Sequence, residues 1–410
     1  MANNKILSRD ELERQIEAWR KHNKNIILTN GAFDLLHVGH RSHSPGAAPI
    51  VSAGITASIP PNRLLVVRLG AMGDVIHTLA AITSLRAQCP DMKVGWLIED
   101  RWSELLCAGG TPLSGPRSPQ RPVVDVVHVV DTKRWRKSLL SHQTKHEVRH
   151  ALREVRDQHY EIAADFQGAL KSAAFARMSN ADVVFGFVHP REWPARLFYQ
   201  HPVEASGAHV IEQYHSLAEA VVEKPLPRTA PMFPHDENAE AAIAKKLSGL
   251  GKNLAIINPG AGWGSKQWPA ARYGEVARAL ALVGMFPLIN FGPNEHKLAY
   301  EVHTASDGLA QPISCSMSEL IALTRQAQVF IGGDTGPLHL AAALQVPVVG
   351  IFGPTDPARN GPYGAKSVVL RNPASRTSLS HTRAPDPGLL AISVEEVVNA
   401  ARELLRATSA

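Results

Sequence analysis

The stretch RLLVVRLGAMGDVIHTLAAITSLRAQ (63–88) decides the fold class of this chain. It begins with an apolar run typical of a buried strand, turns at Gly70 and Gly73, and continues as an apolar helix. Glycines permit the tight turn and close backbone approach found after a strand of a nucleotide-binding sheet. Asp74 stands at or next to the N-cap of the helix, at the carboxyl edge of the strand. The stretch predicts an α/β unit, and it leaves Asp74 two roles, helix cap or general base.

Strands and helices alternate along the rest of the chain, on both sides of a proline-rich joint. Such alternation builds parallel sheets from βαβ units. We therefore expect an α/β fold with two doubly wound, Rossmann-like domains that face each other across a cleft. The expected divisions are a fragment at 1–40, a flexible linker at 41–62, a first domain at 63–223, a hinge at 224–234, a second domain at 235–390 and a C-terminal helix at 391–410.

Composition narrows the class of protein. The chain has 410 residues, of which 44% are hydrophobic and 20% charged, so it can bury folded cores. Aromatic residues make up only 6%, which argues against a stacking surface for nucleic acid. No apolar run approaches the roughly 20 residues that span a bilayer, and no signal peptide is visible. Cys89, Cys107 and Cys315 share no metal-binding spacing, which favours a reducing cytoplasm over a disulfide framework or zinc site.

Positive charge is concentrated in one segment, KRWRKSLLSHQTKHEVRHALREVR (133–156). Eight Lys and Arg stand there against two Glu, and this local excess equals the net charge of +6 of the whole chain. A basic patch indicates an anionic partner, whereas the alternative is the solvated face of a helix.

Two turns in the second half have the composition of a phosphate site. GGDTGPLHLAAAL (332–344) places glycines between a strand and a helix that has Pro337 in its first turn, where proline is favoured. The N–H groups and positive dipole end of such a helix can hold a phosphate. INPGAGWGSKQWP (257–269) adds Lys266, either a countercharge for phosphate or a surface lysine.

A different pattern, TNGAFDLLHVGH (29–40), stands near the N-terminus. His37 and His40 flank a glycine turn and can stabilise a triphosphate in nucleotidyl transfer. A complete nucleotide-binding domain needs several βαβ units of about 30 residues each, and only the linker follows His40. We therefore expect a truncated, catalytically silent fragment.

The motifs of residues 63–410 together resemble glycosyltransferase family 9, the ADP-heptose:lipopolysaccharide heptosyltransferases, and within it the heptosyltransferase I group. The resemblance implies a GT-B fold, with the acceptor on the N-terminal domain and the nucleotide-sugar donor on the C-terminal one. It also implies an inverting, metal-independent transfer without a cofactor at the cytoplasmic face of the inner membrane. The stretches that carry it, in family order, are GAMGDVIHTLAAI, DFQGALKSAA, SKQWP, GGDTGPLHLAAAL and GIFGPTDPARNGPYG.

The resemblance assigns roles position by position. Asp74 matches the base that takes a proton from a Kdo hydroxyl as this oxygen attacks the anomeric carbon of heptose. Lys266 matches the lysine that offsets charge on the departing ADP, and Glu295 matches the acid that holds the ribose. The further donor-binding matches are Gly333, Asp334, Thr335 and Gly336, and the acceptor-binding matches are Gly73, Arg134, Arg136 and Lys137.

The expected partners are ADP-heptose, Kdo-lipid A and, peripherally, the inner-membrane surface, with no nucleic acid. Residues 26–40 separately resemble the start of the cytidylyltransferase-like domain of ADP-heptose synthase, with Ala32 in place of a cysteine common there. One alternative function is therefore nucleotidyl transfer in ADP-heptose synthesis through His37 and His40. The other is a non-catalytic sugar-nucleotide-binding protein. The two complete domains of transferase motifs, and Asp74, favour the heptosyltransferase.

Overall fold

The computed structural model describes residues 61–138, 141–251, 253–378 and 384–409. The expected fragment at 1–40, with His37 and His40, lies outside the described residues, as does almost all of the linker expected at 41–62. The described residues up to Asp131 and from Glu147 onward form one compact unit. The segment Thr132–His146 belongs to a second unit and is described by itself.

A parallel sheet of six strands occupies the first half of the described chain, in the order β3-β2-β1-β4-β5-β6. This is the strand order of doubly wound, dinucleotide-binding folds. The order reverses between β1 and β4, where Val67 pairs with Asp165 at the carboxyl ends of the two strands. The strands are β1 (Arg63–Val67), β2 (Lys93–Glu99), β3 (Val126–Val130), β4 (Ile162–Asp165), β5 (Val183–Phe187) and β6 (His201–Val203).

A second parallel sheet repeats this topology in the order β12-β11-β10-β7-β8-β9. Its order reverses between β7 and β10, where Gly332 pairs with Asn258. Two Rossmann-like folds are therefore present, as the sequence predicts. The strands are β7 (Leu254–Asn258), β8 (Phe286–Asn290), β9 (Gln311–Ile313), β10 (Ala327–Gly333), β11 (Val348–Phe352) and β12 (Ser367–Arg371). They lie inside the expected second domain, as β1–β6 lie inside the first, and the domain boundaries themselves stay predictions.

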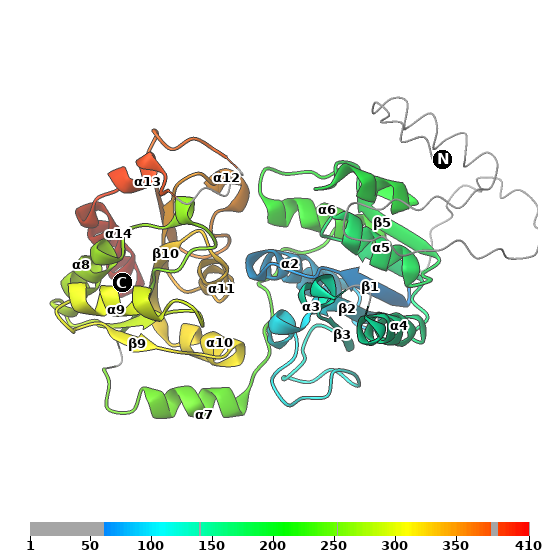
Figure 1. The fold of residues 1–410 in the computed structure, drawn as a ribbon, viewed down its shortest axis with the longest axis horizontal. Helices are drawn as coiled ribbons and strands as arrows, with labels where there is room; N and C mark the ends of the chain where they lie inside the picture. The colour runs from blue at the N-terminus through cyan, green and yellow to red at the C-terminus, as the bar shows by residue number, and fades with distance from the viewer. Residues whose placement is uncertain (1–60, 139–140, 252, 379–383, 410) are drawn as a thin grey trace, which may run out of the picture. The chain divides into compact units, whose positions relative to one another are not determined.

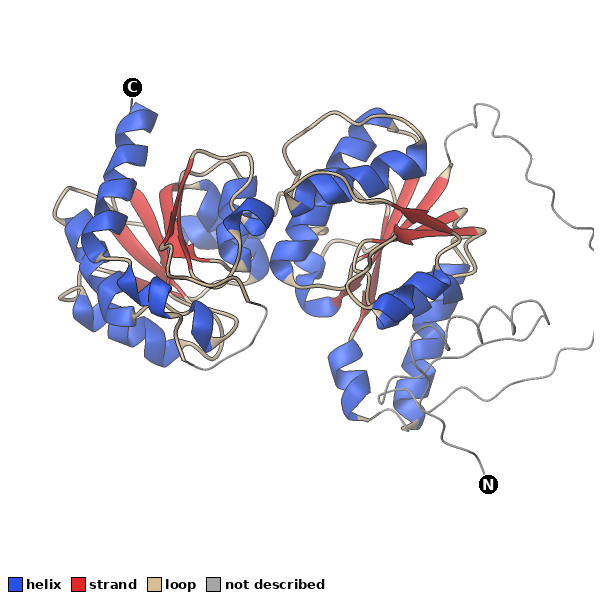
Figure 2. Ribbon diagram, turned by 90° about the horizontal axis from the view of Figure 1, so that it is seen from above, coloured by secondary structure: helices blue, strands red, loops and turns tan. Residues whose placement is uncertain are grey.

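Helices connect the strands and cover both faces of each sheet (Figures 1 and 2). In the compact unit, α2 (Met72–Gln88), α5 (Leu170–Met178), α6 (Val210–Val222) and the 3₁₀ turns η1 (Asp100–Leu105) and η2 (Trp193–Phe198) come with the first sheet. α3 (Thr132–Lys137) belongs to the other unit, and α4 (His142–Arg156) enters the compact unit from Glu147 onward. With the second sheet come α7 (Glu237–Lys246), α8 (Ala270–Ala281), α9 (His296–Ala305), α10 (Met317–Arg325), α11 (Gly336–Ala343), α12 (Pro357–Asn360), α13 (Pro387–Ala391), α14 (Val394–Ser409) and η3 (Gly264–Lys266). No described helix combines the length and apolar character needed to cross a bilayer.

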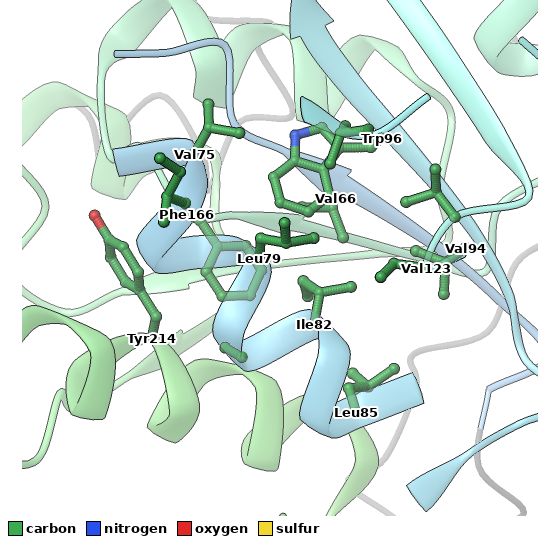
Figure 3. Close-up of a cluster of buried hydrophobic side chains, with 14 of the residues drawn as sticks. Val66, Val75, Leu79, Ile82, Leu85, Val94, Trp96, Val123, Phe166 and Tyr214 are labelled. Carbon is green, nitrogen blue, oxygen red and sulfur yellow. The ribbon is translucent and has the colours of Figure 1, made fainter. Parts of the chain in front are cut away.

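The hydrophobic face of α2 fixes the turn that carries Asp74. Val75, Leu79 and Ile82 recur at helical spacing and form one buried cluster with Val66 of β1 and Trp96 of β2 (Figure 3). Burying an aliphatic side chain of this size contributes about 1.5–3 kcal/mol. The helix is therefore held firmly against the sheet, and its first turn is held with it.

The start of α2 differs from the expectation. The helix begins at Met72, and its N-cap is Ala71, whose backbone is extended. Asp74 is therefore the third helical residue, and the expectation that it lies at or next to the N-cap is wrong. An acid at this position can still serve the helix end, because its carboxylate accepts a hydrogen bond from the Ala71 N–H at 3.2 Å.

Candidate active site

Asp74 presents a partly exposed carboxylate at the switch point of the first sheet. Its side chain is 36% exposed, and Oδ2 lies 2.6 Å from Nη2 of Arg68. The same oxygen accepts the hydrogen bond from Ala71. The other oxygen, Oδ1, has no hydrogen-bond or ionic partner among the described residues. The carboxylate is thus anchored on one side and open on the other.

Arg68 anchors that carboxylate from a buried position. It follows β1 directly, and its Nη1 donates a hydrogen bond to the carbonyl of Phe166 at 2.6 Å. The guanidinium also lies over the ring of Tyr214, 5.4 Å from the centroid. Burial alone would lower the pKa of Arg68, but the negative charge of Asp74 contributes most to the opposing effect, and the net shift is upward.

Lys266, Asp334 and His339 form a charged chain at the second sheet. The Lys266 ammonium pairs with Oδ2 of Asp334, and Nε2 of His339 lies 3.1 Å from Oδ1 of the same carboxylate. Burial would raise the pKa of Asp334, but the hydrogen bond and charge of His339, followed by the charge of Lys266, hold it well below its usual range. Lys266 also lies 4.5 Å from the ring centroid of Trp263. Asp334 thus positions Lys266 at the turn between β10 and α11.

The start of α11 lies at the switch point of the second sheet. β10 ends at Gly333, Thr335 is the N-cap, and α11 begins at Gly336. The hydroxyl of Thr335 accepts a hydrogen bond from Asn258, the last residue of β7, at 3.3 Å. The positive end of the helix dipole is therefore directed to the place where doubly wound sheets bind phosphates.

Glu295 lies beyond the end of β8, next to the glycine loop that follows β7. Its Oε2 accepts a hydrogen bond from the Gly292 N–H at 2.7 Å. A Cβ on Gly260 would lie only 2.5 Å from the Glu295 carboxylate, so the loop backbone and the acid are in close contact. In doubly wound folds, an acid after the second strand is the group that binds a ribose hydroxyl.

The first turns of α2 and α11 touch each other within the compact unit. A Cβ on Gly73 would lie 2.8 Å from the His339 ring, and a Cβ on Gly336 would lie 2.6 Å from the Met72 side chain. The structure therefore brings the turn of Asp74 together with the Asp334–His339 turn. It gives Gly73 a packing role, and the acceptor role expected for this glycine stays a prediction.

Arg134, Arg136 and Lys137 lie on the short helix α3. All three are exposed, while Trp135 between them is buried. Their expected role in binding an acceptor stays a prediction. No group of three or more His, Cys, Asp or Glu side chains in the described part of the chain is placed to hold a metal ion.

Sequence reasoning missed three polar residues that shape the site: Arg68, His339 and Asn258. Arg68 directly precedes the GAMGD turn and His339 follows Asp334 by five residues, so their proximity in sequence was an available signal. Asn258 gives a weaker signal, since a polar residue ending an apolar strand is also common in plain turns. Asp165, by contrast, is a structural acid, because it is fully buried and accepts hydrogen bonds from Tyr199 and Ser172.

Comparison with known proteins gives independent evidence on the family and the fold. Lipopolysaccharide heptosyltransferase 1 of Pseudomonas aeruginosa PAO1 is 29% identical over 313 residues, covering 75% of this chain and 83% of that protein. The structure of E. coli heptosyltransferase WaaC with ADP-2-deoxy-2-fluoro heptose matches with a TM-score of 0.65 at 25% identity, covering 83% of this chain and 99% of that one. A glycosyl transferase of family 9 from Veillonella parvula DSM 2008 matches in fold, with a TM-score of 0.72 at 22% identity and 85% and 99% coverage.

These likenesses confirm the expected α/β GT-B fold class. The family model described as Glycosyltransferase family 9 (heptosyltransferase) matches residues 148–385, which is more than half of the chain. Because this family model covers more than half of the chain and the relatives agree with it, the chain belongs to glycosyltransferase family 9, the heptosyltransferases, and is a glycosyltransferase.

Proposed function

We propose that this chain transfers heptose from ADP-heptose to a Kdo residue of the lipopolysaccharide inner core, with inversion and with Asp74 as the general base. The names of the relatives support a lipopolysaccharide heptosyltransferase, and WaaC with an ADP-heptose analogue supports the donor. The observation that carries the proposal is the open carboxylate of Asp74 on a turn that touches the α11 turn.

The donor site follows from the second sheet. The diphosphate of ADP would lie at the start of α11 and take Lys266 as its countercharge. Asp334, which pairs with Lys266, would then be available to hydroxyls of the sugar. Glu295 would hold the ribose from the end of β8. Each of these groups lies on a turn at the carboxyl end of a strand, so the sheet itself sets their spacing.

A single displacement accounts for the transfer. Asp74 takes the proton of an acceptor hydroxyl while the oxygen forms a bond to the anomeric carbon. The bond from this carbon to the phosphate oxygen of ADP breaks at the same time, and its electron pair leaves with ADP. Lys266 and the N-terminus of α11 stabilise the charge that develops on the leaving diphosphate, so the reaction is proposed to need no metal.

The acceptor that we propose is anionic. Kdo-lipid A carries carboxylates and phosphates, and the exposed residues Arg134, Arg136 and Lys137 offer matching charge on α3. The same basic segment would favour a peripheral position at the cytoplasmic face of the inner membrane, because anionic lipids attract clusters of Lys and Arg.

The test is incubation of the purified chain with ADP-heptose and Kdo-lipid A, followed by mass spectrometry of the lipid. We expect addition of one heptose. Asp74→Asn should bind ADP normally but transfer about 10²–10⁴-fold more slowly, the range typical of a lost general base. Asp91→Asn, at an exposed aspartate after the same helix, is the matched control. Wild-type turnover by Asp74→Asn would show that Asp74 is not the general base. An unmodified lipid would show that Kdo-lipid A is not the acceptor.

A further inference from the structure

The carboxylate of Asp74 is restrained in an asymmetric way. Both donors that contact it, the Arg68 guanidinium at 2.6 Å and the Ala71 N–H at 3.2 Å, contact Oδ2. Oδ1 is left without a partner among the described residues, on a side chain that is 36% exposed. A base needs an oxygen with a free lone pair facing its substrate, and here only Oδ1 meets that need.

The capping of α2 does not require such an arginine. α6 also has an acid in its third position, and Glu212 accepts a hydrogen bond from the His209 N–H at 3.1 Å as Asp74 does from Ala71. No ion pair to Glu212 occurs within the described ranges. An acid in the third position can therefore accept the N-cap N–H without a buried cation, which indicates that Arg68 serves something other than this hydrogen bond.

Burying the Arg68 side chain in this position costs stability, which indicates that the residue has a function there. Its side chain is only 5% exposed, and Nε is buried without a hydrogen-bond partner in the described part of the chain. Leaving a buried donor unpaired destabilises a fold, and natural sequences retain such conflicts mainly at functional sites. The two terminal nitrogens are both used, one on the carbonyl of Phe166 and one on Asp74.

We propose that Arg68 is a positioning residue for the transfer reaction: it holds Oδ2 of Asp74 and thereby presents Oδ1 as the atom that takes the acceptor proton. The planar fork of an arginine can bind the carbonyl after β4 and the carboxylate on α2 together, which fixes the plane of the carboxylate. A lysine offers a single charged point and can satisfy one of the two partners fully. This inference rests on the proposed role of Asp74 as base.

The experiment compares Arg68→Gln and Arg68→Lys with a matched control, Arg86→Gln. Arg86 is also buried and also paired with an aspartate, Asp125 at 2.8 Å, but it lies in the last turn of α2. We expect Arg68→Gln to lower kcat about 10- to 100-fold, as misplacement of a catalytic group does, with KM for ADP-heptose changed less than about 3-fold. Arg68→Lys should recover part of kcat.

Every rate is divided by the number of ADP-binding sites, measured by titration calorimetry. A merely structural arginine would reduce the number of sites and leave kcat per site unchanged, which is the result we expect for Arg86→Gln. If Arg68→Gln does not fold, Arg68→Lys decides, because the inference requires its kcat per site to be below wild type. Wild-type kcat in the folded Arg68 variants, together with the expected slow transfer by Asp74→Asn, would overturn the inference and leave the proposed function standing. Wild-type turnover by Asp74→Asn would instead overturn the base assignment in the proposed function, on which the inference rests.

Discussion

In the proposed donor site, Lys266 is the residue that we expect to contribute most to ADP binding, because Asp334 holds its ammonium at the start of α11. We expect Lys266→Ala to weaken ADP binding about 10- to 100-fold, since a charge-assisted hydrogen bond contributes about 1.5–3 kcal/mol. Transfer should slow as well, because the leaving diphosphate loses its countercharge. Titration calorimetry with ADP measures the effect. Lys245→Ala, at an exposed lysine of α7, is the control. Equal ADP affinity in both variants would show that Lys266 does not bind the donor.

Glu295 allows a second test at the scale of one residue, directed at the ribose. If its carboxylate binds ribose hydroxyls, wild-type protein should bind ADP about 10-fold or more tightly than 2′-deoxy- or 3′-deoxy-ADP. Glu295→Ala should weaken ADP binding and bind the three nucleotides with nearly equal affinity. The contact of Gly260 with this carboxylate is the structural basis, because it places the acid beside the loop after β7. A variant that still discriminates against the deoxy nucleotides would assign the ribose to another residue.

At the scale of elements, the contact between α2 and α11 depends on two glycines. A Cβ on Gly73 meets the buried ring of His339, and a Cβ on Gly336 meets the buried side chain of Met72, including its Cβ, which the backbone of α2 holds in place. We expect Gly73→Ala and Gly336→Ala each to lower the free energy of unfolding by about 1–3 kcal/mol, because neither the His339 ring nor Met72 Cβ can make room without a shift of its helix. Gly251→Ala, where the added carbon meets nothing within 4 Å, should be near neutral. Urea unfolding measures all three.

Gly73→Ala should also slow heptose transfer. Displacing the His339 ring breaks its contact with Asp334, and Asp334 in turn holds Lys266. Weaker ADP binding is therefore expected in the fraction that folds. Unaltered ADP affinity in Gly73→Ala would show that the helix contact and the Lys266 chain are independent.

The helices and strands also show how much of the fold can be predicted from the sequence. Apolar runs and glycine turns sufficed to predict two doubly wound folds and a C-terminal helix, which the structure begins at Val394. Short strands such as β6 and β9 were missed, because their three-residue runs HPV and QPI carry little apolar periodicity. The ion pairs of Asp74 and Asp334 were also missed, because they depend on backbone geometry at turns, which periodicity does not encode.

At the scale of the whole molecule, several histidines are buried with their pKa lowered. Burial is the main cause for His77, His128, His209 and His215, and it brings the pKa of His128 and of His215 to about 4. In the unfolded chain a histidine has a pKa of about 6.5. Between these values the unfolded state binds more protons than the folded state, so the stability from neutral histidines is present above about pH 6.5 and is lost as pH falls toward 4.

His215 on α6 provides the test of this acid sensitivity. Its side chain is 1% exposed, and Nδ1 has no hydrogen-bond partner in the described ranges. It lines a cavity of about 230 Å³, so a leucine can occupy the same space. We expect unfolding free energies from urea titrations to fall between pH 6.5 and 4, and His215→Leu to reduce that loss by up to about 3 kcal/mol. His189→Leu, at a histidine whose side chain is 85% exposed, should leave the loss unchanged. The same pH dependence in wild type and His215→Leu would show that His215 takes no part in the acid sensitivity.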